Sequence, residues 1–170
     1  MEIHKASTEH GHIRLAAASD AHGSRENMNR LLQALPPIDM FCYLGDTAAD
    51  ASYLRAALAT RQPDAAFHSV SGNVGPDYDE PAELTLRLSG FKLLMVHGHI
   101  LRVKLTTMFL AERAKAVGAQ IALYGHTHIP DAAMWRDGVM LINPGALRDG
   151  RYALITLRDD VQPDVRLLAL

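Results

Sequence analysis

The sequence contains a single cysteine, Cys42, among its 170 residues. One cysteine cannot form an intrachain disulfide, so a secreted scaffold held together by disulfides is excluded, and we expect a cytoplasmic protein. No apolar run approaches the ~18 residues that a membrane-spanning helix needs. Residues 1–12 also lack an apolar stretch of signal-peptide length. These absences lead us to expect neither secretion nor a membrane association.

Excess charge is also scarce, because 17 Lys and Arg oppose 19 Asp and Glu, for a net charge of −2 with neutral His. That balance excludes the broad basic footprint of a general nucleic-acid binder. The sequence has neither a Gly-x-Ser-x-Gly motif nor a glycine-rich phosphate loop, which argues against acyl transfer and nucleoside triphosphate binding. Any anionic substrate must therefore be attracted by local charge.

What the sequence does have is enough apolar material, 48% of its residues, for a hydrophobic core at this length. We expect a single domain over residues 13–170, preceded by a flexible tail over residues 1–12.

The first half of that domain predicts strands alternating with helices. The expected strands are 13–18, 40–44 and 66–70. Ser24 and Asp50 are placed to cap the two helices between them. This βαβαβ order favours a parallel sheet with helices packed on it.

The second half is richer in strands. The expected elements are a hairpin of 84–88 and 91–96, a helix over 104–117, a strand at 121–124, a hairpin turning at Asp137-Gly138, and closing strands at 152–157 and 165–168. Together the two halves indicate an α/β sandwich of two sheets with outer helices.

Five of the expected strands end in residues that can bind a metal ion. These residues are Asp20 with His22, Asp46, Asn73, His97, and His126 with His128. Strand ends converge at one edge of an open α/β sheet, so these side chains are expected to meet. Mixed oxygen and nitrogen ligands suit a borderline divalent metal. Seven ligands exceed the four of a tetrahedral ion, which favours a dinuclear site.

A His-x-His or an Asp-x-His by itself is usually part of a surface loop. The occurrence of such residues at the ends of five strands favours the metal site, because ordinary loops do not explain why each strand end carries a residue that can bind a metal.

The ordered set Asp20-x-His22, Gly45-Asp46, Gly72-Asn73, His97 and Gly125-His126-x-His128 resembles the calcineurin-like metallophosphoesterases, and within them the small YfcE-type phosphodiesterases. The resemblance implies a four-layer αββα sandwich of two mixed sheets. It further implies one ion held by Asp20, His22, Asp46 and His128, and a second held by Asp46, Asn73, His97 and His126, with Asp46 as the bridge.

The function that this resemblance implies is metal-dependent phosphodiester hydrolysis, with in-line attack by a hydroxide that bridges the two ions. The expected cofactors are two divalent ions, manganese first, with iron, zinc or nickel as alternatives. The expected substrate is a phosphorylated small molecule or a nucleotide-like molecule. A homo-oligomer is left open.

One position departs from the family pattern. Many relatives have a His after the Gly-Asn pair that helps to protonate the leaving oxygen, whereas this sequence has Val74. His99 is the nearest replacement acid, with support of His97 or a purely structural role as alternatives. Asp77 and Asp79 are weaker candidates. The missing acid also raises the alternative of a metal-binding interaction scaffold, which the retromer subunit of this fold exemplifies.

Overall fold

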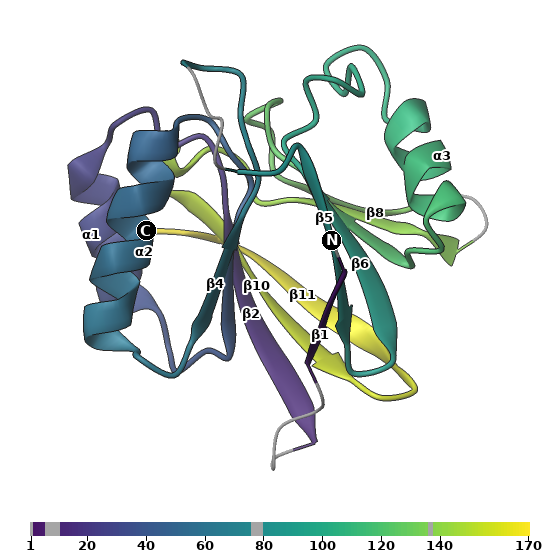
Figure 1. Cartoon of the computed structure of the whole chain (residues 1–170), viewed down its shortest axis with the longest axis horizontal. Helices are drawn as coiled ribbons and strands as arrows, with labels where there is room; N and C mark the ends of the chain where they lie inside the picture. The colour runs from purple at the N-terminus through teal and green to yellow at the C-terminus, as the bar shows by residue number, and fades with distance from the viewer. Residues whose placement is uncertain (1, 6–10, 76–79, 136–137) are drawn as a thin grey trace.

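Two β-sheets face each other and form the inner layers of the molecule (Figure 1). In this computed structural model, which describes residues 2–5, 11–75, 80–135 and 138–170, helices α1 and α2 lie outside one sheet and α3 lies outside the other. Both sheets mix parallel and antiparallel pairs. The expected α/β sandwich with outer helices is confirmed.

The first sheet has five strands in the order β11-β10-β2-β3-β4. Strands β2, β3 and β4 run parallel, and β10 and β11 complete the sheet as antiparallel neighbours. The bounds are His12–Ala18 for β2, Met40–Tyr43 for β3, Ala66–Ser69 for β4, Arg151–Arg158 for β10 and Val161–Ala169 for β11.

The second sheet has six strands in the order β1-β5-β6-β7-β9-β8. Strands β6, β7 and β9 run parallel, and β5 and β8 pair with them as antiparallel partners. The bounds are Glu2–Lys5 for β1, Glu83–Leu88 for β5, Phe91–Val96 for β6, Ile121–Leu123 for β7, Asp131–Met134 for β8 and Met140–Asn143 for β9. The β8–β9 pairing is as expected, although Asp137 of its predicted turn lies outside the described residues.

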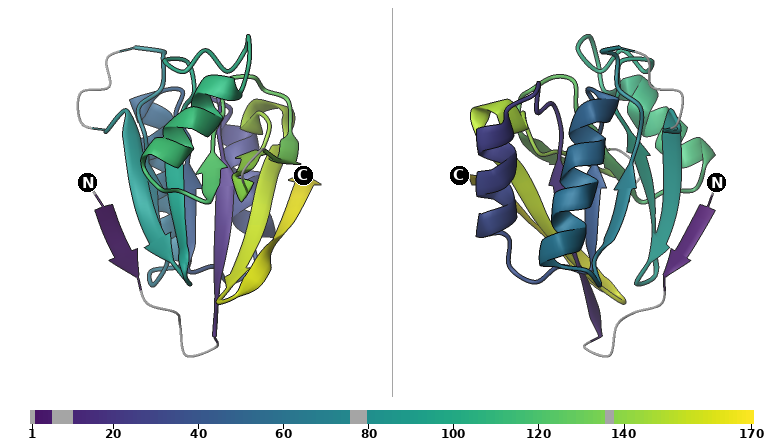
Figure 2. Two further views of the ribbon diagram at one scale, coloured as in Figure 1. Left: turned by 90° about the vertical axis from the view of Figure 1, so that its right-hand side faces the viewer. Right: turned by 60° about the vertical axis from the view of Figure 1, so that its left-hand side comes forward.

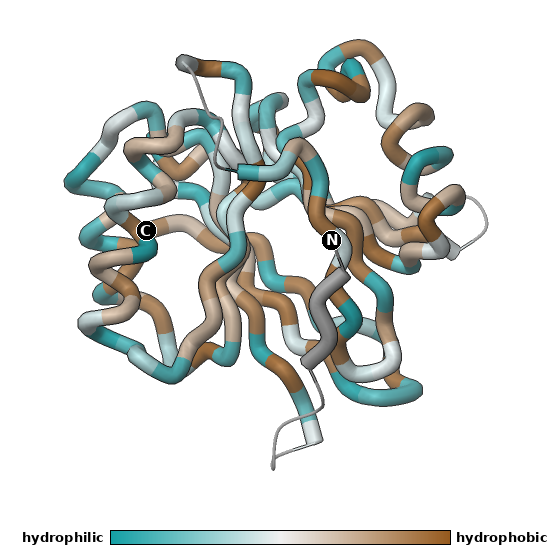
Figure 3. The backbone as a smooth tube through the Cα atoms, viewed as in Figure 1, coloured by the Kyte–Doolittle hydropathy of each residue, from teal (hydrophilic) through white to brown (hydrophobic). Residues whose placement is uncertain are grey.

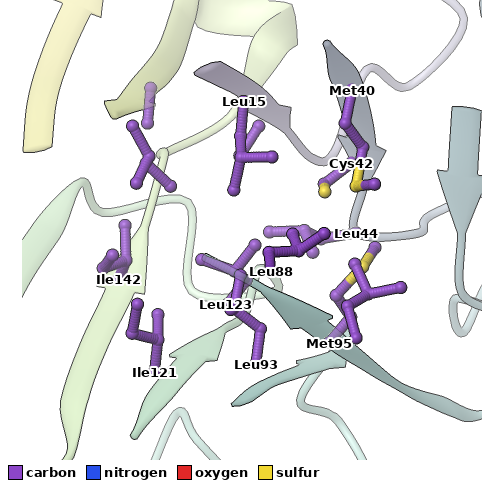
Figure 4. Close-up of a cluster of buried hydrophobic side chains, with 14 of the residues drawn as sticks. Leu15, Met40, Cys42, Leu44, Leu88, Leu93, Met95, Ile121, Leu123 and Ile142 are labelled. Carbon is purple, nitrogen blue, oxygen red and sulfur yellow. The ribbon is translucent and has the colours of Figure 1, made fainter. Parts of the chain in front are cut away.

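The main core fills the space between the two sheets (Figure 4). Side chains of β2 and β3 point from one sheet and meet those of β6, β7 and β9 from the other. Fully or almost fully buried members include Leu15, Cys42, Leu44, Leu93, Met95, Leu123 and Ile142. Burial raises the pKa of the Cys42 thiol to about 12, so this cysteine is an apolar core residue rather than a reactive group.

Two further apolar clusters lie on the outer faces of the sheets. Helices α1 (Arg25–Ala34) and α2 (Ala48–Arg61) cover the five-stranded sheet, and α3 (Met108–Ala116) covers the six-stranded one. Figure 3 shows hydrophobic stretches along the inner strands, whereas the connecting loops mix hydrophilic and hydrophobic residues.

The predicted capping residue is correct for α1 and wrong for α2. Ser24 accepts a hydrogen bond from the Asn27 amide, as predicted for a cap. Helix α2, by contrast, is capped by Thr47, which accepts from the Asp50 amide. The prediction that Asp50 is the cap was wrong because Thr47 already has the extended backbone of a cap. The Asp50 carboxylate instead accepts from the Gly23 amide.

The other differences lie near the edges of the fold. Part of the segment expected to be a flexible tail forms β1, which pairs with the edge of β5, and His12 already belongs to β2. Backbone pairing at a sheet edge needs no apolar periodicity, so a strand at this position could not be predicted from the residue pattern. Helix α3 begins at Met108 rather than near Lys104, because residues 100–105 form turns.

The loops that follow the parallel strands of both sheets gather at one end of the molecule, drawn at the top of Figures 1 and 2. None of the helices in the described ranges has the length and apolar character needed to cross a membrane.

Candidate metal centre

The shared end of the two sheets brings together residues from five strands. Asp20 and His22 follow β2, Asp46 follows β3 and Asn73 follows β4, while His97 follows β6 and both His126 and His128 follow β7. Asp20, Asp46 and His97 are almost fully buried, whereas His22 and Asn73 are exposed. The site therefore has a buried floor and an open upper side.

Asp20, His22 and His128 form the tightest cluster. Their ligand atoms all lie within 4.8 Å of one another. His128 Nε2 lies 3.2 Å from Asp20 Oδ1 and 3.3 Å from His22 Nε2. Three ligand atoms thus converge from two different sheets.

Asp46 contacts this cluster through His22. Its Oδ2 accepts a hydrogen bond from the His22 amide at 3.1 Å and lies 3.3 Å from His22 Nδ1. Burial raises the pKa of Asp46, with further increases from Asp20 and Asp50 that the neighbouring His22 partly offsets. A nearby cation would therefore favour the ionised carboxylate.

His97 and Asn73 form the second group of ligand atoms. His97 Nδ1 lies 2.7 Å from the Leu44 carbonyl oxygen, which can only accept, so Nδ1 donates. In a neutral ring the lone pair then belongs to Nε2, which lies 2.7 Å from Asn73 Oδ1 and 3.9 Å from Asp20 Oδ1. The lone pairs of His97 Nε2 and Asn73 Oδ1 therefore face each other at short distance, and a cation bound between these two atoms would offset their repulsion.

His126 completes the second group. Its ring centre lies 5.0 Å from that of His97, and its amide donates to Asp20 Oδ2 at 2.9 Å. Burial, followed by the nearby His97 and Lys104, lowers the pKa of His126 to about 4. The ring is neutral at physiological pH, as a metal ligand must be.

The backbone at the site is strained. Five of the seven candidate ligands have positive φ, namely Asp20, His22, Asp46, His126 and His128. Such conformations cost roughly 1–3 kcal/mol each and cluster at functional sites. Glycines allow the close approach of these loops, because a Cβ on Gly72 would lie 2.3 Å from the Asp46 amide nitrogen, and one on Gly125 would lie 1.9 Å from Ser19 Oγ.

Two supporting residues were not predicted from the sequence. Ser19 Oγ donates to Asp20 Oδ2 at 2.6 Å. The fully buried Asn143 side chain donates to the Gly125 carbonyl and to Thr127 Oγ1, and its oxygen accepts from the Gly145 amide. Asn143-Pro144-Gly145 has the composition of a turn, and that composition alone does not indicate this role of the Asn143 side chain.

His99 lies beside the ligand groups rather than among them. Its ring centre is 5.4 Å from that of His97 and 6.1 Å from that of His126. Burial and the adjacent His97 lower the pKa of His99, so its ring is neutral near pH 7. Val74 lies exposed on the β4 side of the site, and its amide donates to the Asp46 carbonyl. Asp77 and Asp79 lie outside the described residues.

This donor set fits divalent metal ions. Carboxylate oxygens, an amide oxygen and imidazole nitrogens converge, with Asp20 Oδ1 lying 3.2 Å from His128 Nε2 and 3.9 Å from His97 Nε2. Borderline metals such as manganese, iron and zinc accept this mixture of ligands.

We expect Asn143→Ala to weaken manganese binding about tenfold, because the loop that carries His126 and His128 would lose two of its supports. Calorimetric titration with Mn²⁺ measures the affinity. Asn29→Ala is the matched control, since Asn29 accepts a hydrogen bond from Tyr53 in the helical layer. Unchanged affinity in Asn143→Ala would show that Asn143 does not support the centre.

Comparisons with known proteins agree with this geometry. Residues 13–160 match the calcineurin-like phosphoesterase superfamily domain. The chain is 31% identical over 150 residues to the "Probable metallophosphoesterase YsnB" of Bacillus subtilis (strain 168), a match that covers 84% of this chain and 83% of that protein.

Three solved structures share the fold. A predicted phosphoesterase from Streptococcus pneumoniae TIGR4 has a TM-score of 0.76 at 24% identity, over 93% of this chain and 90% of that one. A novel archaeal phosphodiesterase has a TM-score of 0.72 at 17% identity, with 93% and 100% coverage. Zinc-complexed Vps29 from Entamoeba histolytica has a TM-score of 0.71 at 16% identity, with 92% and 99% coverage. On the family match, the sequence relative and the geometry of its strand ends, the chain belongs to the calcineurin-like phosphoesterase superfamily.

Proposed function

We propose that the protein is a dinuclear metal-dependent phosphodiesterase. The observation that carries this proposal is the convergence of Asp20, His22 and His128 at one end of the sheets, with Asn73 and His97 directly beside them. Membership of the phosphoesterase superfamily supports hydrolysis of a phosphoric ester. The similarity of fold to an archaeal phosphodiesterase supports diesters as the substrate class.

The ligands divide into two sets. In the proposed arrangement Asp20, His22, Asp46 and His128 hold one ion, while Asp46, Asn73, His97 and His126 hold the other. Asp46 is the proposed bridge because seven ligands can give each ion four only if one carboxylate is shared. Manganese is the proposed metal, and iron, zinc and nickel are compatible with the same ligand types.

Divalent ions, when bound, polarise phosphoryl oxygens and lower the pKa of a water molecule for in-line attack. The protein's own residues hold the ions in place and set the charge of the site. Asp20 and Asp46 contribute two negative charges, so two ions leave the site with about +2, enough to attract a phosphodiester to a chain of net charge −2. The expected substrate is a phosphorylated small molecule or a nucleotide-like molecule.

No proton donor replaces the family's acid at position 74. Val74 has an aliphatic side chain that can neither donate a proton nor form a hydrogen bond. Acid catalysis contributes roughly 10²–10⁴-fold in typical enzymes. We therefore propose that substrates with good leaving groups are favoured.

A scaffold function is the second candidate, and the specific observation in its favour is this same Val74. Against it stands the full set of ligands. Two buried carboxylates and strained backbone at five ligand positions are costly features, and a surface that only binds a protein partner has no need of them.

We expect Asp46→Ala to weaken the binding of both ions, because the carboxylate is shared. His128→Ala should mainly weaken one ion, and Asn73→Ala the other. Titration with Mn²⁺ followed by metal analysis gives the stoichiometry and affinity of each variant. Asp64→Ala, which removes an exposed carboxylate just beyond α2, is the matched control. Two tightly bound ions in Asp46→Ala would contradict the assignment of the bridge.

We further expect the rate to depend steeply on the pKa of the leaving group, because position 74 supplies no proton. Aryl diesters should react well and alkyl diesters poorly, as kcat/KM across a series of diesters at saturating metal would show. Val74→His should accelerate the poor leaving groups selectively. A selective loss on poor leaving groups in His99→Ala would identify His99 as an acid, whereas equal losses on all esters would indicate that His99 supports His97. A shallow dependence in the unmodified protein would contradict the account.

A further inference from the structure

The loop between β6 and α3 is fixed beside the metal centre by close packing. Val103 is almost fully buried, and its amide lies 3.3 Å from the Gly98 carbonyl oxygen. A Cβ at Gly98 would lie 2.7 Å from Val103 Cγ2, and Gly98 has a φ of 110°. The loop is therefore packed closely against the residue that follows His97.

The next residue, Lys104, lines a cavity of about 530 Å³ beside the ligand loop. The lining residues include Val103 and Lys104 from the β6–α3 loop, and Tyr124, Thr127, Ile129 and Asp131 around the β7–β8 loop. Thr127 lies between the candidate ligands His126 and His128 in the sequence, so one wall of the cavity is formed by the loop that carries both of them. Its size suits a small organic group rather than a single ion.

Lys104 brings an uncompensated positive charge to this cavity. It is exposed, and within the described part of the chain no carboxylate forms an ion pair or hydrogen bond with it. Arg148 and Arg25, by contrast, are engaged, since Arg148 Nε lies 3.6 Å from Asp149 Oδ1 and the Arg25 guanidinium lies 3.9 Å from the centre of the Tyr53 ring.

Another part of the cavity wall has the opposite character. It is formed by Tyr124 and the exposed Asp131, so this wall presents an aromatic residue and a carboxylate. An anionic group would be repelled there and attracted by Lys104. Val103 and Ile129 supply apolar surface for a carbon skeleton.

We propose that this cavity is a substrate subsite in which Lys104 binds a second anionic group, a carboxylate or a phosphate, carried by one of the groups esterified to the scissile phosphate. The preferred substrates are thus phosphodiesters with an additional negative charge a few bonds from the reacting phosphorus. This inference rests on the proposed phosphodiesterase function and assigns its substrate class. Lys104 is then a specificity-determining residue.

The test uses two matched pairs of probes on the full-length, manganese-loaded protein. The first pair is 4-nitrophenyl propyl phosphate and its 2-carboxyethyl counterpart, compared by kcat/KM. The second pair is propylphosphonate and 3-phosphonopropionate, which are not hydrolysed, compared by calorimetric binding. Lys104→Met removes the charge. Arg61→Met, which removes an exposed cation from the last turn of α2, is the matched control.

We expect the unmodified protein to prefer the carboxylate member of each pair about fivefold, as a single exposed ion pair allows. Lys104→Met should lose that preference without slowing the propyl ester, Lys104→Arg should keep it, and Arg61→Met should behave like the unmodified protein. High salt should reduce the preference by screening.

The outcomes separate the two proposals. Equal affinity for the two phosphonates would overturn the subsite, and so would an equal loss of kcat/KM on both esters in Lys104→Met. Hydrolysis of the propyl ester would still support the phosphodiesterase function in either case. Absence of hydrolysis together with a Lys104-dependent preference between the phosphonates would overturn the diesterase function and retain the anion site.

Discussion

The candidate centre depends above all on one buried carboxylate, that of Asp20. Its Oδ2 accepts hydrogen bonds from Ser19 Oγ and from the His126 amide, which comes from the opposite sheet. Its Oδ1 lies near His128 Nε2 and His97 Nε2. A buried carboxylate is costly unless its oxygens accept hydrogen bonds or bind a cation. The hydrogen bond from the His126 amide to Asp20 therefore holds the strand ends of the two sheets together.

The sandwich tolerates this arrangement because its stability comes from elsewhere. The apolar core between the sheets contains no ligand residue, and separate apolar clusters hold the helices on the outer faces. The strained backbone is concentrated in loops at one end, where several ligand side chains would repel one another without a cation. A bound ion would convert that unfavourable proximity into coordination, which links metal binding to the stability of this end of the fold.

The sequence predicted the strand ends well because an apolar strand followed by a metal-capable residue is a local pattern. That pattern identified the residues that the structure brings together after β2, β3, β4, β6 and β7. It could not identify Asn143, whose role depends on two loops meeting in space, nor Lys104, which a helical periodicity assigned to α3. Packing of Val103 on Gly98 overrides that periodicity and makes Lys104 part of a loop.

The sequence also misassigned β1 and the cap of α2, for different reasons. Strand β1 is held by backbone pairing with the edge of β5. Its four residues are too few to show an alternation of apolar and polar side chains. At α2, Thr47 and Asp50 are both good capping residues, and only the backbone angles decide between them. Asp50 lies in the first turn of α2 instead, and its carboxylate accepts a hydrogen bond from the Gly23 amide.

Crystallography of the manganese-loaded protein, with anomalous scattering recorded near the manganese edge, tests the central claim most directly. The account predicts two anomalous peaks about 3.5–4 Å apart at the shared end of the sheets. One peak should lie among Asp20, His22 and His128, and the other beside Asn73, His97 and His126. A single peak, or peaks away from these side chains, would contradict it.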